Sequence, residues 1–221
     1  MDYDKEYRQI TMIERFVDVR DRNVLEIGCG DGSMSILLAR DAREYIAIDP
    51  DEPRIREAQL LASNVEFQIG TGEALEFTDA SFHVVLFTLS LHHQNSQLAL
   101  KEADRVLTEN GQLVILEPAA DGELQQFFHL FNDETQALTE ALNAIEQSDF
   151  KQEHHETFCT VMTFHNYEEL CRYPFDRTTR DPNDCARILE KLRQLHGSLT
   201  DIQPIHLHDK IHIFSLRKTH P

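Results

Sequence analysis

The stretch Val24–Gly32, "VLEIGCGDG", decides how the rest of the chain is interpreted. An apolar run ends there in three glycines, Gly28, Gly30 and Gly32, although the 221-residue chain has only 8 glycines in all. Glycine has no Cβ atom, so such a loop turns tightly between a strand and a helix and lets a ligand approach the backbone. The stretch therefore predicts a nucleotide-type binding loop.

Acidic residues near this loop narrow the class of ligand. The spacing is G-x-G-x-G rather than the G-x-G-x-x-G of dinucleotide-binding loops, and Glu26 stands two positions before Gly28. Glu26 would repel a pyrophosphate and attract an ammonium group. Asp49 follows the next predicted strand, 49 − 28 = 21 residues beyond Gly28, which is the distance typical of an acid that binds ribose hydroxyls. We expect a nucleoside ligand with a cationic tail.

The order of predicted elements is that of an α/β protein. Strand-like apolar runs alternate with amphipathic helical stretches through the first half, which is typical of a parallel sheet with helices on both faces. The third of these helices is expected to end at Asn110-Gly111, with the glycine in the left-handed conformation. The C-terminal "IQPIHLHDKIHIFSLRK" predicts two short strands around Asp209-Lys210. Further strands are predicted over 23–27, 45–48, 65–69, 82–89, 112–116 and 156–164.

Two later blocks extend the pattern of the glycine loop. They are "GTGEALEFTDASFHVVLFTLSLHH", from Gly70, and "EADRVLTENGQLVILEP", which ends at Pro118. With the loop and Asp49, they resemble the class I S-adenosylmethionine-dependent methyltransferases over Val24 to Pro118. The resemblance is strongest to the small-molecule branch that includes ubiquinone/menaquinone-biosynthesis and biotin-pathway enzymes.

The resemblance implies a fold and a division of the chain. The fold class is α/β, with a Rossmann-like, doubly wound, mostly parallel seven-stranded sheet, a C-terminal antiparallel hairpin and a helical and strand substrate cover. A single methyltransferase domain, 1–221, would comprise an N-terminal lid or helix (1–22), a cofactor-binding core (23–120), the substrate cover (121–195) and the C-terminal hairpin (196–221). Tyr3 and Tyr7 are candidate lid residues.

The resemblance also implies a cofactor, S-adenosyl-L-methionine, and residues that hold it. Glu26 and the loop backbone would face its methionine part, Asp49 its ribose, and Pro50 and the "GTGEAL" stretch its adenine. Thr71 stands where the family usually has an acid, and His83 where it commonly has an aspartate. The implied cofactor-binding set is Glu26, Gly28, Gly30, Asp49, Pro50, Thr71, Gly72, Glu73 and Leu89.

Candidate catalytic residues lie at the carboxyl edge of the predicted sheet. His92 and His93 follow the fourth strand of the core and Glu117 ends the fifth, where doubly wound folds bind ligands. Each could act as a base or orient an acceptor, or have no catalytic role, because in-line methyl transfer depends chiefly on placement.

Other clusters favour structural interpretations. Phe127, Phe128 and Phe131 have the spacing of a helix core more than of a substrate pocket. Five histidines lack partners at ligand-like spacing and are expected to be exposed, so no metal site is predicted. They are His154, His155, His206, His208 and His212.

Composition limits the partners. With 39 acidic and 21 basic residues, the net charge of −18 argues against nucleic-acid binding. No apolar run approaches the roughly 20 residues of a membrane span, and the polar N-terminus is not a secretory signal. We expect a cytoplasmic protein with reduced cysteines that acts on a small-molecule acceptor.

Two other functions remain open on the sequence. A catalytically silent S-adenosylmethionine-binding protein, acting as a sensor or partner subunit, would keep the loop and the fold, and Thr71 supports it. An NAD-dependent oxidoreductase would share the strand order and the ribose-binding acid. The glycine spacing and Glu26 argue against this last alternative.

Overall fold

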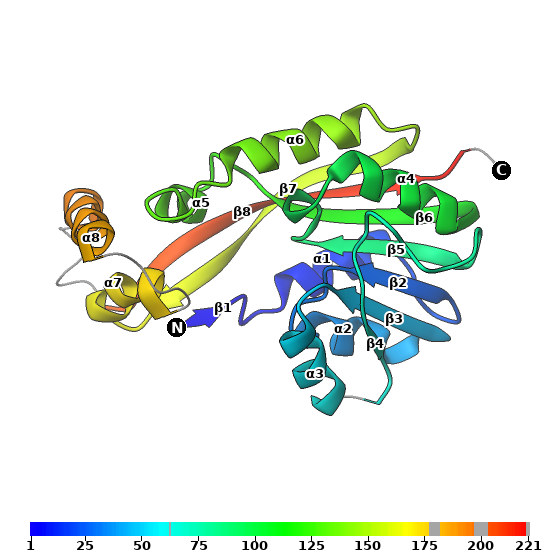
Figure 1. Cartoon of the computed structure of the whole chain (residues 1–221), viewed down its shortest axis with the longest axis horizontal. Coiled ribbons are helices and arrows are strands. Elements are labelled where there is room, and N and C mark those ends of the chain that lie inside the picture. The colour runs from blue at the N-terminus through cyan, green and yellow to red at the C-terminus, as the bar shows by residue number, and fades with distance from the viewer. Residues whose placement is uncertain (62, 177–181, 197–202, 220–221) are drawn as a thin grey trace.

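A mixed eight-stranded sheet organises the computed structural model, which describes residues 1–61, 63–176, 182–196 and 203–219. The strands are β1 (Asp2–Tyr3), β2 (Asn23–Ile27), β3 (Glu44–Asp49), β4 (Glu66–Ile69), β5 (Phe82–Thr88), β6 (Leu107–Pro118), β7 (Lys151–Phe164) and β8 (Ile205–Arg217). The helices are α1 (Arg8–Phe16), α2 (Ser33–Leu38), α3 (Glu52–Leu61), α4 (Ser96–Val106), α5 (Glu123–Phe128), α6 (Thr135–Glu146), α7 (Tyr167–Asp176) and α8 (Pro182–His196). The strand order is β1-β7-β8-β6-β5-β2-β3-β4 (Figure 1).

The parallel half of the sheet carries helices on both faces, as the sequence predicted. Strands β4, β3, β2, β5 and β6 run parallel, and their side chains alternate between the faces. On one face α1, α2 and α3 pack against residues such as Val24 and Ala47. On the other, α4 and α6 cover Leu25 and Ile46. The switch in strand order lies between β2 and β5, so the carboxyl ends of these strands form the expected ligand edge.

Strands β7 and β8 form a long antiparallel arm. They pair from Lys151↔Arg217 to Phe164↔Ile205, and in Figure 1 the arm runs past the other strands to α5, α7 and α8. Its far end has a separate apolar core in which Phe127 is fully buried. The helix-core interpretation of Phe127 is therefore confirmed, while Phe128 and Phe131 are only partly buried against the same cluster.

Two local predictions were wrong. The segment around Asp209-Lys210 is one continuous strand, β8, and its hairpin partner is β7, because the alternating side chains of Ile205–Arg217 pair with β7 along their whole length. Helix α4 ends at Val106, before Asn110-Gly111, and it is Asn110 that has a positive φ of 59°. The sheet also gains an eighth strand, since β1 pairs antiparallel with β7.

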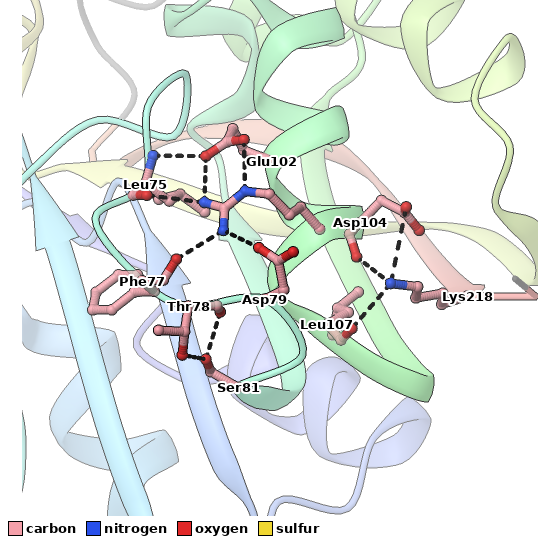
Figure 2. A network of polar contacts seen from close by, with 10 residues as sticks. Leu75, Phe77, Thr78, Asp79, Ser81, Glu102, Asp104, Leu107 and Lys218 are labelled. Atoms are coloured by element: carbon pink, nitrogen blue, oxygen red, sulfur yellow. Dashed lines mark hydrogen bonds and ion pairs between the residues drawn. The ribbon is translucent and has the colours of Figure 1, made fainter. Parts of the chain in front are cut away.

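One arginine ties the loop after β4 to the core. Figure 2 shows Leu75, Phe77, Asp79 and Glu102 around a single guanidinium group, that of Arg105 on α4. Arg105 donates to the carbonyl oxygens of Leu75 (2.9 Å) and Phe77 (2.8 Å) and to both carboxylates. Because this loop contains three of the predicted cofactor-binding residues, Arg105 helps to fix that wall of the ligand edge.

The N-terminal strand is fixed by a buried polar cluster. The hydroxyl of Tyr3 donates to Asp209 Oδ2 on β8 and accepts from Gln9 Nε2 at 2.8 Å. Asp209 is 3% exposed, and its other carboxylate oxygen has no hydrogen-bond partner. Tyr3 is thus a sheet residue in this structure, whereas Tyr7 is exposed.

We expect Asp209 to make the protein less stable as pH rises. Burial raises the pKa of Asp209 to about 6, from about 3.9 in an unfolded chain. The folded state therefore binds more protons between these values, so the free energy of unfolding falls by about 3 kcal/mol as pH rises from about 4 through about 6. Urea unfolding of the wild type and Asp209→Asn across this range checks it. Asp121→Asn, an exposed carboxylate paired with Lys210, is the control.

As the pH increases, the free energy of unfolding of the wild type should fall relative to that of Asp209→Asn, because asparagine does not titrate. A difference that stays constant over the range would contradict the prediction.

Among the described residues, no helix is long and apolar enough to cross a membrane.

Candidate functional site

The three glycines of the loop have different neighbours. All three have positive φ, 78° at Gly28, 58° at Gly30 and 73° at Gly32. A Cβ on Gly28 would lie 2.3 Å from the Cβ of Ser90, and one on Gly32 would lie 2.5 Å from the ring of Phe67. A Cβ on Gly30 would meet only the guanidinium of Arg54, at 3.5 Å. Gly28 and Gly32 therefore serve protein packing, and Gly30 presents the open face of the loop.

Asp49 holds the loop at the end of β3. Its Oδ2 accepts from the backbone N–H of Gly30 at 2.8 Å and its Oδ1 accepts from that of Asp51 at 2.9 Å. The N–H groups of Gly28 and Cys29 both donate to the carbonyl of Ile48 on the same strand. The fold thus brings the two sequence signals, loop and acid, into direct contact.

Glu26 lies beneath the loop rather than on its surface. Its carboxylate is 0% exposed and accepts from Thr88 Oγ1 at 2.6 Å and Tyr45 OH at 2.9 Å. Burial raises the pKa of Glu26, and these two hydrogen bonds oppose that effect. In this arrangement Glu26 joins β2 to the neighbouring strands β3 and β5, and its contact with a cofactor ammonium group stays a prediction.

The surroundings of Cys29 in this loop disfavour a role as a nucleophile. Its thiol is buried, and burial together with the negative charges of Glu26 and Asp49 raises its pKa. The thiolate, which is the reactive form, is therefore disfavoured. Cys159 and Cys171 are free as well.

The loop after β4 supplies a second wall. The N–H of Gly72 donates to Gln94 Oε1 at 3.0 Å, and a Cβ on Gly72 would lie 2.5 Å from the same oxygen. Thr71 is exposed, and Glu73 accepts from the backbone N–H of Asn95. The Gly72 N–H is thus already paired within the protein, and the adenine contacts of this loop stay predictions.

A buried ion pair closes the carboxyl edge of β6. Glu117 is 0% exposed, its Oε1 accepts from the N–H of Leu91 at 2.9 Å, and its Oε2 lies 2.6 Å from His92 Nδ1. Burial disfavours the charged imidazole, but the hydrogen bond and charge of Glu117 outweigh it, so the pKa of His92 is raised. Two of the predicted catalytic residues thus form one unit.

His93 lies on the outer side of this unit. Its ring is tilted against that of His92, with centroids 3.9 Å apart, and its side chain is 60% exposed. Burial of part of the ring and the neighbouring His92 lower the pKa of His93. Glu134, just before α6, lies 3.8 Å from a ring nitrogen of each histidine.

The remaining predicted residues divide into two groups. Leu89, with φ 60°, and the exposed Pro50 follow β5 and β3 at the same sheet edge as the loop. His83 accepts from the N–H of Asn23 at 3.1 Å, a contact between β5 and β2. The histidines of β7 and β8 are exposed or half-buried, and His212 lies opposite Glu117 in the pairing of β6 with β8.

Sequence reasoning missed four residues that shape this edge. Tyr45 donates to Glu26, and Ser90 lies against Gly28. Gln94 accepts from Gly72, and Glu134 lies near the two histidines. None belongs to a pattern with fixed spacing. Only Ser90 had an indirect indication in the sequence, because a glycine such as Gly28 in a loop often marks the close approach of another residue.

Comparisons with known proteins agree with this geometry. Residues 25–115 match the family model described as "Methyltransferase domain". The "Uncharacterized methyltransferase YcgJ" of Bacillus subtilis is 30% identical over 120 residues, 51% of this chain and 47% of that protein. The "Probable S-adenosylmethionine-dependent methyltransferase Rv3030" of Mycobacterium tuberculosis is 35% identical over 98 residues, 44% of this chain and 36% of that protein. By sequence, the chain spans about half the length of the first of these relatives and about a third of the second.

Solved structures give the same fold over nearly the whole chain. The crystal structure of YcgJ from Bacillus subtilis superposes with a TM-score of 0.71 at 19% identity, covering 97% of this chain and 100% of that one. The fold and loop define a Rossmann-like α/β domain of the nucleoside-binding type. Residues 25–115 are similar to a methyltransferase domain, and a relative named as S-adenosylmethionine-dependent indicates S-adenosylmethionine as the cofactor of such a domain.

Proposed function

We propose that this protein transfers a methyl group from S-adenosylmethionine to a small-molecule acceptor by in-line displacement. The observation that carries the proposal is the loop around Gly30, open on one face and hydrogen-bonded to Asp49. The buried pair of His92 and Glu117 follows β5 and ends β6, at the same carboxyl edge of the sheet. The cover formed by α5 to α8 then supplies the acceptor side.

The residues present fit an adenosyl cofactor. The position that a Cβ would fill at Gly30 is open, so a ligand can approach the backbone there. Asp49 is 9% exposed at the end of β3, and its carboxylate oxygens retain lone pairs for ribose hydroxyls. The rest of the cofactor would be enclosed by Leu89, Pro50 and the Thr71–Glu73 turn.

The main contribution of the chain to the reaction would be to position the acceptor against the cofactor. The bound cofactor supplies an electrophilic methyl group on a sulfonium. The chain would hold the acceptor atom in line at about 3 Å, which can supply much of the rate acceleration. His92, held by Glu117, and His93 beside it would orient the acceptor or take its proton where the acceptor must lose one.

Asp49→Ala is expected to weaken cofactor binding by about 10- to 100-fold, since hydrogen bonds to a charged group contribute about 1.5–3 kcal/mol. Calorimetry with S-adenosylmethionine and with its demethylated product measures this change. Glu44→Gln, which removes a charge at the exposed opposite end of β3, is the matched control and should bind as the wild type does. Equal affinities in all three proteins would contradict the assigned role of Asp49.

Turnover separates the proposal from its alternative. Release of the demethylated product is followed over a panel of oxygen, nitrogen, sulfur and carbon acceptors. Methyl transfer to any small molecule supports the proposal. Binding without transfer across the panel favours a silent binding protein, and no binding at millimolar cofactor overturns both.

A further inference from the structure

We propose that His92, His93 and Glu134 form a binding site for a divalent transition-metal ion of the Zn²⁺ class. One ligand atom from each residue lies within 4.8 Å of the others. His92 Nε2 is 3.8 Å from Glu134 Oε2, and His93 Nδ1 is 3.8 Å from Glu134 Oε1. Within the described ranges of the chain, no other set of three His, Cys, Asp or Glu residues gathers in this way.

The separations suit a shared ion better than direct hydrogen bonds. An N–H···O hydrogen bond spans about 2.7–3.2 Å, which is shorter than either 3.8 Å contact. Ligands on a tetrahedral Zn²⁺, with bonds of about 2.0–2.2 Å, lie about 3.4 Å from one another. The two 3.8 Å contacts are each about 0.4 Å longer than this, and the three ligand atoms lie within 4.8 Å of one another, so pair distances would shorten by at most about 1.4 Å on binding the ion.

The support behind His92 is that of a metal-binding imidazole. Its Nδ1 lies 2.6 Å from Glu117 Oε2, while Glu117 is fixed by the N–H of Leu91. This leaves Nε2 as the atom that faces Glu134. A carboxylate on the far nitrogen of a ligating histidine sets its tautomer and orientation and raises its basicity.

Tertiary contacts place the third ligand. Glu134 precedes α6 and accepts from Asn132 Nδ2 at 2.9 Å, which restrains its carboxylate. Helix α6 packs on the turn that carries the two histidines. With three protein ligands, the ion keeps a coordination position open, as metal ions that bind a substrate or water do.

The charge balance at this edge favours a dication. The carboxylates of Glu117 and Glu134 face the histidines, and Arg54 on α3 is the cation whose charge reaches His93. An ion on His92 Nε2 takes the place of a proton there, so the imidazole is neutral and the two carboxylates against one arginine leave a net negative charge for the ion to neutralise. The open position would take an oxygen of a small molecule, such as a hydroxyl or carboxylate.

The site is distinct from the histidines of the arm. His155 Nε2 and His212 Nδ1 are 3.1 Å apart, the distance of a direct hydrogen bond. These two residues pair across β7 and β8 without a carboxylate in the cluster, and they offer a control for adventitious metal binding.

The test uses the 221-residue chain without a histidine tag, after dialysis against a chelator. Co²⁺ is titrated and its visible absorption followed, and Zn²⁺ binding is measured by calorimetry. We expect one high-affinity ion per chain in the wild type, an affinity at least tenfold lower in His93→Ala and in Glu134→Gln, and no loss in His212→Ala. Thermal unfolding of each apo variant verifies that it folds.

Two outcomes would overturn the site: no binding below millimolar metal, or binding that His212→Ala abolishes and His93→Ala leaves intact. The measurement contains no S-adenosylmethionine and no acceptor. The metal site can therefore fail while the proposed methyl transfer stands, and the reverse also holds.

Discussion

Gly28→Ala is expected to destabilise the protein by about 2–5 kcal/mol, from about 1–2 kcal/mol of left-handed strain and about 1–3 kcal/mol of overpacking. The new Cβ would lie 2.3 Å from the Cβ of Ser90. Ser90 cannot retreat freely, because its Oγ donates to the carbonyl of Ile27 and its own carbonyl accepts from His93 N and Gln94 Nε2. Urea unfolding monitored by circular dichroism measures the loss.

Gly30→Ala is the matched control for this prediction. It has a φ of 58°, and its new Cβ would make only an ordinary van der Waals contact with Arg54 at 3.5 Å, so only the strain of about 1–2 kcal/mol applies. We expect Gly30→Ala to fold and yet to lose cofactor affinity, because its methyl group occupies the open face of the loop. Equal losses of stability in the two variants would refute the assignment of different neighbours to these glycines.

Glu117→Ala is expected to cost about 3–5 kcal/mol of stability, the range found when one partner of a buried pair is removed. Glu117 has no exposed surface, and its carboxylate serves both the ring of His92 and the N–H of Leu91. Truncation leaves both groups buried without their acceptor. Thermal and urea unfolding at neutral pH measure the effect.

Glu117→Gln distinguishes the loss of charge from the loss of the acceptor. The amide oxygen can still accept from Leu91, so we expect this variant to lose clearly less stability than Glu117→Ala. Thr78→Ala, on the exposed loop before β5, removes only a hydrogen bond with Ser81 Oγ and should change stability by no more than about 1 kcal/mol. A cost below 1 kcal/mol for Glu117→Ala would contradict the role of the buried pair.

Much of the fold follows from local patterns. The expected strand 23–27 coincides with β2, and those at 45–48, 65–69 and 82–89 differ from β3, β4 and β5 by a residue or so at an end. Each is a short apolar run bounded by turn residues, a signal that needs no knowledge of distant contacts. The C-terminal strand was misjudged, because its Asp209-Lys210 polar pair resembles a turn when read locally and becomes part of a strand when β7 pairs with it.

The site was predicted only in part. The glycine loop and Asp49 were found because their positions depend on a strand, a turn and a fixed number of residues, and the structure joins them through the Gly30 N–H. Glu117 and His92 were both identified, but no sequence pattern indicated that they form one buried pair. Glu134 was not found at all, because it comes from the cover, 41 residues (134 − 93) beyond His93.

The sequence by itself determined the parallel α/β core and the ligand loop, because hydrophobic alternation and the left-handed glycine conformations are properties of neighbouring residues. Only the tertiary structure decided that Gly30 alone of the three loop glycines has an open face, that Glu26 lies buried beneath the loop, and that Glu134 reaches the two histidines. These features depend on strand register and on how α6 packs across the sheet. Such contacts join residues that are distant in sequence, so no periodic pattern in the sequence predicts them.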